Sequence, residues 1–373
     1  MSAAAPDAPA WRLALYQIAT LAFVVMAGTA VLSLPLVLTT YAGQDAWLAA
    51  LLASPVGLVP LALLYLLERQ APGLTLAEHA RRALGRALGG ALALAWALFL
   101  ATTLPVVVRE FADLVRSEAL PRTPEPVVLG LLLLVPTYMA RQGAEPIARV
   151  AGVLTPLAAV ALVVIFLPSL GAARLEHLLP VWALGWRAVL QAAAPAAAFY
   201  GETALLGFVL PFRGGSMAGA WAAAALGLGA VAVTVAAATA WALLVFGPLT
   251  AVLPNTLFQV TRAASVAEFV THLDALFIGV WLAGGLVKLA LWLFCTTVSL
   301  AQALGLPDYR ALSLPVAAFG LVAGCAWFPS SGDVVRWIER AWPFWGLAFE
   351  LGVPLVVVAG ALLRRPAGRV RRP

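Results

Sequence analysis

Six charged side chains interrupt long apolar stretches of this sequence, in places where a charge is costly. They are Arg109, Glu110, Asp113, Glu202, Lys288 and Glu350. Ionisable residues at membrane depth usually face the protein interior or a wet cavity, and they often carry ions, protons or substrate. These six residues are therefore the first candidates for chemistry.

Lys288 is the most informative of the six, because all the other basic residues, among 23 in total, are arginine. A buried ammonium group can lose its proton near neutral pH, whereas a guanidinium group cannot. We expect Lys288 to be a titratable charge that is partnered by Glu110 or Glu202 and takes the place of a bound sodium ion. A fixed buried ion pair is the alternative.

Further residues complete the expected proton- or ion-coupling set. Arg109 and Asp113 are four positions apart and should pair along one helix face, either within the site or as a structural ion pair. Glu110 is offset by one position and should point elsewhere. Thr296 and Thr297 are candidate hydroxyl ligands for a cation, although such residues also bond their own helix backbone.

The elements that carry these side chains are membrane helices. The chain has 373 residues, of which 63% are hydrophobic and 11% charged, and its mean hydropathy is +0.97. These values predict an all-α integral membrane protein. Runs of about 20 apolar residues predict ten transmembrane helices, at residues 13–40, 45–67, 90–115, 125–140, 146–168, 188–211, 217–247, 273–304, 311–328 and 343–363.

Ten helices divide into two sets of five, and an odd number inverts the second set relative to the first. We expect a first repeat over residues 13–168 and an inverted second repeat over residues 186–363, between tails at 1–12 and 364–373. Both repeats open with an apolar helix that contains glycine and proline, at Gly28–Pro35 and at Pro195–Glu202. We expect helices 1 and 6 to be broken there, because interrupted backbone at membrane depth must face protein, ligand or a cavity.

The two expected breaks suggest a ligand class. Free N–H groups at a half-helix favour an anionic group and free carbonyls favour a cation, so an amino acid would satisfy both. The expected ligand-binding residues are Gly28, Thr29, Ala30 and Val31 in helix 1, and Phe199, Tyr200, Gly201 and Glu202 in helix 6.

The arginines predict the orientation. Fourteen fall in segments assigned to the inner side and seven in outer loops, with Arg109 inside a helix. This excess favours cytoplasmic N- and C-termini, and the arginine-rich tail would also attract anionic membrane lipid. The basic residues are scattered rather than gathered on a face, so no nucleic-acid partner is expected.

Nothing in the sequence predicts an enzyme, a metal site or a cofactor. The three histidines, His79, His177 and His272, fall in loops, and no HExxH motif occurs. Cys295 and Cys325 lie within apolar runs and are expected to be small packing residues.

The order of several short motifs resembles the spore-germination permease family, the B subunits of GerA-type nutrient germinant receptors. This family belongs to the amino acid, polyamine and organocation transporter superfamily. Besides Gly28–Pro35, the matching pieces are Asp45-Ala46-Trp47, Pro72 to Glu78, Arg109-Glu110-Phe111, Leu120 to Pro124, Leu178-Leu179-Pro180, Tyr200-Gly201-Glu202, Glu268-Phe269, Leu273 to Leu276, Trp281 and Lys288.

This resemblance implies a leucine-transporter-type fold, amino-acid-like germinants, and assembly with an A subunit and a lipoprotein C subunit in the inner spore membrane. His272 departs from the family, which often has arginine at that place. Two functions follow: a membrane-embedded subunit that senses a nutrient amino acid, or a proton-coupled amino acid permease.

Overall fold

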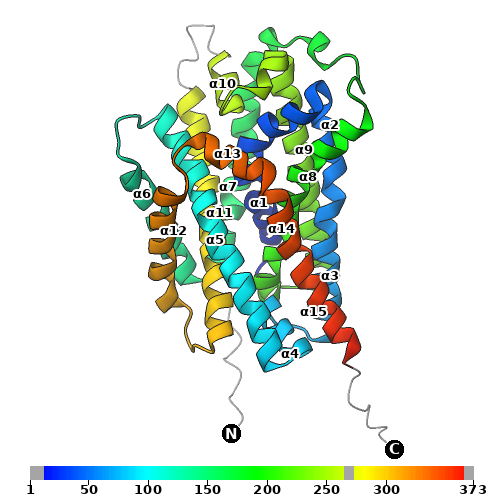
Figure 1. Cartoon of the computed structure of the whole chain (residues 1–373), viewed down its shortest axis with the longest axis vertical. Coiled ribbons are helices and arrows are strands. Elements are labelled where there is room, and N and C mark those ends of the chain that lie inside the picture. The colour runs from blue at the N-terminus through cyan, green and yellow to red at the C-terminus, as the bar shows by residue number, and fades with distance from the viewer. Residues whose placement is uncertain (1–11, 264–272, 365–373) are drawn as a thin grey trace, which may run out of the picture.

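The structure, a computed structural model, describes residues 12–263 and 273–364 (Figure 1). His272, the Glu268-Phe269 motif and nearly all of both predicted tails lie outside the described residues. Within the described part the secondary structure is helical, apart from one isolated bridge between Leu13 and Arg213. The all-α prediction agrees with this.

The longer helices run side by side along the long axis of the molecule, and shorter ones close its two ends (Figure 1). The α-helices are α1 (Leu15–Ala42), α2 (Ala46–Ala53), α3 (Leu58–Gln70), α4 (Leu76–Leu84), α5 (Arg86–Glu118), α6 (Glu125–Gln142), α7 (Ala144–Phe166), α8 (Gly185–Gly201), α9 (Met217–Phe246), α10 (Thr256–Ala263), α11 (Leu273–Leu304), α12 (Ser313–Trp327), α13 (Ser331–Arg340), α14 (Trp342–Glu350) and α15 (Gly352–Leu363).

Seven helical stretches of the described chain are long and apolar enough to cross a membrane. They are Leu15–Gln70, Arg86–Glu118, Ala144–Ala172, Met217–Ala251, Asp274–Leu304, Arg310–Trp327 and Trp342–Leu363. The first has 56 residues and contains α1, α2 and α3, which is far more than the roughly 20 residues that one crossing needs. The chain is thus an all-helical membrane protein, while the count of ten helices and the division into 13–168 and 186–363 stay predictions.

The predicted break in the first helix is wrong for this structure, because α1 continues through Gly28 and Pro35. A proline inside a helix removes one N–H donor, and packing against neighbouring helices makes this tolerable in a membrane. Gly28 instead permits close packing, since a Cβ atom there would lie 3.3 Å from Cδ of Lys288. Glycine at this position therefore brings α1 up to α11.

The irregularity predicted in helix 6 is present. α8 ends at Gly201, and the chain continues as a 3₁₀ helix, η5 (Glu202–Phe208). A 3₁₀ stretch of this length is unusual and often marks a functional hinge. Pro195 lies within α8 without ending it, so the change in backbone geometry falls directly at Glu202.

Close packing around small residues holds the bundle together, as is common between membrane helices. η2 (Ser54–Gly57), between α2 and α3, illustrates the point. A Cβ atom on Gly57 would lie 2.7 Å from the carbonyl oxygen of Tyr200 and 2.8 Å from a methyl group of Leu228. The Thr203 hydroxyl donates to the Gly57 carbonyl over 2.8 Å. Gly57 thus fixes the distance between η2 and the α8–η5 junction.

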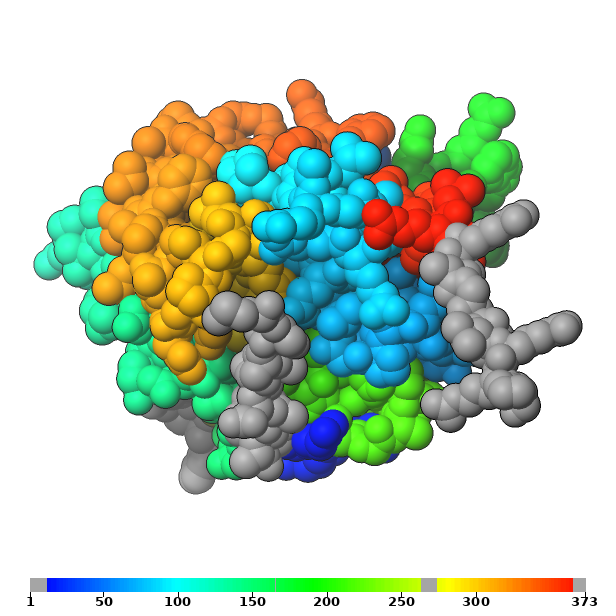
Figure 2. Space-filling model, turned by 90° about the horizontal axis from the view of Figure 1, so that it is seen from below, coloured from blue at the N-terminus to red at the C-terminus, as the bar shows by residue number. Residues whose placement is uncertain are grey.

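One end of the bundle gathers several arginines that the sequence assigned to the inner side. Arg213 pairs with Glu68 at 2.7 Å, Arg12 donates to the Arg213 carbonyl, and Arg364 donates to the Arg82 carbonyl. Figure 2 looks onto this end, where α4 and the start of α5 (cyan) lie beside the end of α15 (red). The predicted inner segments therefore share one face, and the side of the membrane that it occupies stays a prediction.

We expect Gly57→Ala to destabilise the fold by about 1–3 kcal/mol, because the added methyl group meets fixed backbone at Tyr200. Thermal unfolding of detergent-solubilised protein measures the change. Gly90→Ala is the matched control, because Gly90 has open space around it and lies within α5. An equal melting temperature for both variants would contradict this account of the packing.

Candidate functional site

The centre of the molecule holds a buried cluster of polar groups around Lys288. The Lys288 ammonium lies 2.8 Å from both carboxylate oxygens of Glu202 and donates to the Thr29 hydroxyl. Lys288 and Thr29 are 0% exposed and Glu202 is 1% exposed. Of the two expected partners of Lys288, the structure selects Glu202. The cluster joins α11, η5 and α1.

Aromatic rings complete the enclosure. The Lys288 ammonium lies 5.7 Å from the ring centres of both Phe199 and Trp292, a distance at which the ring faces attract a cation. Trp281 donates from Nε1 to the Gly28 carbonyl over 3.0 Å. Sequence reasoning assigned no site role to the two tryptophans. Their spacing from Lys288, seven positions before and four after, places all three on one helix face and is the signal that could have found them.

A very small cavity adjoins the cluster. It has a volume of about 10 Å³, which is room for about one water molecule. Its lining residues are Thr29, Thr103, Val106, Val107, Glu110, Phe199, Glu202, Trp337, Ile338 and Trp342. We call it the central cavity. Its size means that the site is closed in this conformation.

Only some of the predicted ligand-binding residues reach the central cavity. Thr29, Phe199 and Glu202 line it. Gly28 packs against the Lys288 stem, and Gly201 packs against Glu350. Ala30, Val31 and Tyr200 are buried and do not line it. The structure therefore brings together three of the eight residues that the sequence proposed for ligand contact.

A larger cavity of about 260 Å³ lies next to the central one, and we call it the outer cavity. Its lining includes Glu110, Asp113, Glu118, Ser33, Asn255, Ser331 and Ile338. Glu110 and Ile338 line both cavities. The Ser33 hydroxyl donates to Glu110. Glu110 thus lies at the boundary between the outer cavity, whose lining includes three carboxyl groups, and the closed centre.

α13 places Ile338 at this boundary. The helix begins with a capping box in which the Ser330 hydroxyl lies 2.7 Å from Asp333, and these hydrogen bonds lower the pKa of Asp333. Val334 and Ile338, four positions apart, form its buried face. The cap and the apolar stripe together hold Ile338 over the central cavity.

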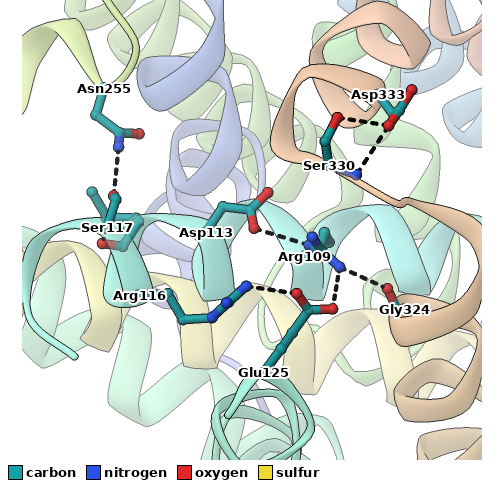
Figure 3. Close-up of polar contacts among 10 residues, drawn as sticks. Arg109, Asp113, Arg116, Ser117, Glu125, Asn255, Gly324, Ser330 and Asp333 are labelled. Atoms are coloured by element: carbon teal, nitrogen blue, oxygen red, sulfur yellow. Dashed lines mark hydrogen bonds and ion pairs between the residues drawn. The ribbon is translucent and has the colours of Figure 1, made fainter. Parts of the chain in front are cut away.

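Arg109 belongs to a separate network that ties three helices together (Figure 3). It binds Asp113 at 2.9 Å, as the spacing predicted, and also binds Glu125 and the Gly324 carbonyl. Arg116 pairs with Glu125 at 2.6 Å. Because these partners join α5, α6 and α12, the geometry favours the structural alternative for this pair.

Thr296 and Thr297 are not brought to Lys288. Their hydroxyls donate to the carbonyls of Trp292 and Leu293 in their own helix, at 2.7 and 2.8 Å. They follow Lys288 by eight and nine positions, which is about 12 Å along a helix. The alternative of bonding to the backbone is the one that the structure adopts.

Comparisons with known proteins agree with this architecture. At the level of fold, the chain resembles Mhp1, a nucleobase-cation-symport-1 family transporter solved in a closed conformation with bromovinylhydantoin bound, with a TM-score of 0.70 and 13% identity. The match covers 96% of this chain and 93% of that one. MhsT in complex with L-phenylalanine gives a TM-score of 0.64 at 14% identity, covering 94% and 97% of the two chains.

Sequence comparison gives the family. Spore germination protein KB of Bacillus subtilis (strain 168) is 29% identical over 297 residues, which is 77% of each protein. The family model described as "Spore germination protein" matches residues 12–326. Because that match covers most of the chain, this protein belongs to the spore germination protein family.

Proposed function

We propose that this chain is the membrane-embedded nutrient-sensing subunit of a spore germinant receptor. Its ligand would be an amino acid bound between α1 and the α8–η5 junction. The observation that carries the proposal is the enclosed Lys288–Glu202–Thr29 cluster beside a small central cavity, in a chain of this family with a transporter fold.

The charges of the cluster suit a zwitterion. α1 is unbroken, so its backbone at Gly28–Val31 offers no free end to a carboxylate, and side chains must take that role. The ligand carboxylate would bind the Lys288 ammonium and the Thr29 hydroxyl, and the ligand ammonium would bind Glu202 or Glu110. One buried ion pair is thereby exchanged for two, with no unpaired charge left behind.

Ligand entry requires a change of conformation, because about 10 Å³ does not hold an amino acid. The outer cavity of about 260 Å³ adjoins it and carries carboxylates that attract an ammonium group. Movement of α13 that withdraws Ile338 would join the two cavities. A ligand that binds only the joined form would shift the population toward it, which is what a sensor needs.

The resemblance to germinant receptors supplies the rest of the proposal. The partners would be an A subunit and a lipoprotein C subunit, the location the inner spore membrane, and both termini would face the cytoplasm. No enzymatic reaction is proposed, since the family and the similar structures are germination proteins and transporters.

A proton-coupled amino acid permease is the second candidate. The transporter fold favours it, as does Lys288, a charge that could replace a coupling sodium ion at the helix 1 interface. Receptor and carrier would share the same pocket and differ in whether the opposite side also opens.

Binding and uptake measured in parallel distinguish the two functions. We expect purified protein in proteoliposomes with an imposed pH gradient to bind an amino acid saturably without accumulating it. Accumulation against a concentration gradient, abolished by Lys288→Ala, would instead establish the permease. Absence of binding across the common amino acids would refute both.

Removing one charge of the central pair should destabilise the protein more than removing both charges. We expect Lys288→Met to destabilise the protein by about 3–5 kcal/mol, because Glu202 is left buried without its cation. The double variant Lys288→Met/Glu202→Gln should recover most of the loss in thermal unfolding. Neither variant should bind the amino acid, and binding by the double variant would exclude a role for the charges in recognition.

The entry route predicts a pattern of thiol labelling. In a background with Cys295→Ala and Cys325→Ala, Leu36→Cys in the outer cavity should react readily with a water-soluble reagent. Val107→Cys, which is buried at the central cavity, should react much more slowly, because labelling there requires opening. Bound amino acid should protect it. Equal labelling rates at both positions would contradict a closed centre that must open before it reacts.

A further inference from the structure

Glu350, at the end of α14, is a buried acid that the proposed ligand contacts do not use. It is 1% exposed, and neither carboxylate oxygen has a hydrogen-bond partner within the part of the chain that the structure describes. Buried carboxyl groups are normally paired, so an unpartnered one calls for a physical explanation.

Small residues press this carboxyl group against α8. A Cβ atom built on Gly201 would overlap a carboxylate oxygen of Glu350, and it would lie 3.2 Å from the carboxyl carbon. A Cβ atom on Gly346 would lie 3.2 Å from Cβ of Ala198, so α14 and α8 touch along this line. Gly201 directly precedes Glu202, which places Glu350 beside the partner of Lys288.

The charges of this region do not balance. Lys288 supplies one positive charge, and its ammonium is already bound by both oxygens of Glu202 and by Thr29. Glu202 and Glu350 supply two carboxyl groups. Glu110, on α5, also lines the central cavity, but it borders the outer cavity and accepts from the Ser33 hydroxyl. Tyr200, the other titratable side chain near this end of α8, is neutral, and α15 contains no titratable residue. The charged residues of α13 lie at the other end of α14. One positive charge is therefore missing near Glu350.

The cation that balances Glu350 must occupy almost no space. Glu350 lines neither the central cavity nor the outer cavity. Its carboxyl group is packed against Gly201, which leaves no room there for a metal ion or a ligand ammonium group. A proton is the one cation that fits without a cavity.

We propose that Glu350 is a proton-binding site beside the central pair. In this closed conformation it is a neutral carboxylic acid. A bound amino acid has no net charge, because its carboxylate takes the Lys288 ammonium while its ammonium takes a carboxylate of the site. No cation is left over for Glu350, so its O–H bond stays intact. The behaviour on ligand binding rests on the proposed function, whereas the presence of the proton does not.

Infrared spectroscopy tests the proton directly. The protein should show a carbonyl stretch of a protonated carboxylic acid that shifts in heavy water, and Glu350→Gln should remove it. Gln is isosteric with the neutral acid, so this variant should keep the melting temperature of the unaltered protein, and Glu350→Leu is a second variant without the acid. Glu176→Gln, at an exposed position, is the control. Loss of the band in Glu202→Gln but not in Glu350→Gln would overturn the assignment, as would its absence from the unaltered protein.

Proton retention is tested with a pH indicator in weakly buffered solution. Amino-acid binding should release no proton from Glu350, because a zwitterion leaves the net charge of the site unchanged. Proton release on binding that disappears in Glu350→Gln would overturn this account. If no amino acid binds at all, the proposed function fails, while the infrared result still decides the proton.

Discussion

The ion pair between Lys288 and Glu202 is the constraint on which the rest of the site depends. The Lys288 ammonium group is 0% exposed, so it needs a partner. Removing one member of a buried ion pair is strongly destabilising, because the other charge is left buried and uncompensated. Since Thr29 also accepts from Lys288, the pair holds α1, η5 and α11 to one another. Any opening of the centre must therefore supply replacement charges.

Close helix packing makes this pair possible. Gly28 lets α1 approach the Lys288 stem, and Gly201 lets the carboxyl group of Glu350 lie against α8. Glycine here shortens distances between helices, which matters in a bilayer because packing rather than water exclusion drives helix association. The same closeness reduces the central cavity to about 10 Å³.

Under the proposed function, the closed centre and the adjoining outer cavity would form a two-state element. The closed state satisfies its charges internally, and an open state would need a molecule that carries both signs of charge. A zwitterion meets that need, so its differential affinity for the open state would shift the population. A receptor and a carrier would use this step in the same way, in keeping with a germination-family chain whose fold resembles that of a transporter.

Local patterns in the sequence were enough to predict the membrane class, the burial of the lone lysine, the Arg109–Asp113 pair and the irregularity at Glu202. Each depends on apolar length, composition or spacing within one helix. The choice of Glu202 over Glu110, the unbroken α1 and the position of Glu350 depend instead on contacts between distant segments. Lys288 and Glu202 are 86 positions apart, and Lys288 and Thr29 are 259 apart. Helical periodicity carries no information across such separations, so only the packing of whole helices decided which charges meet.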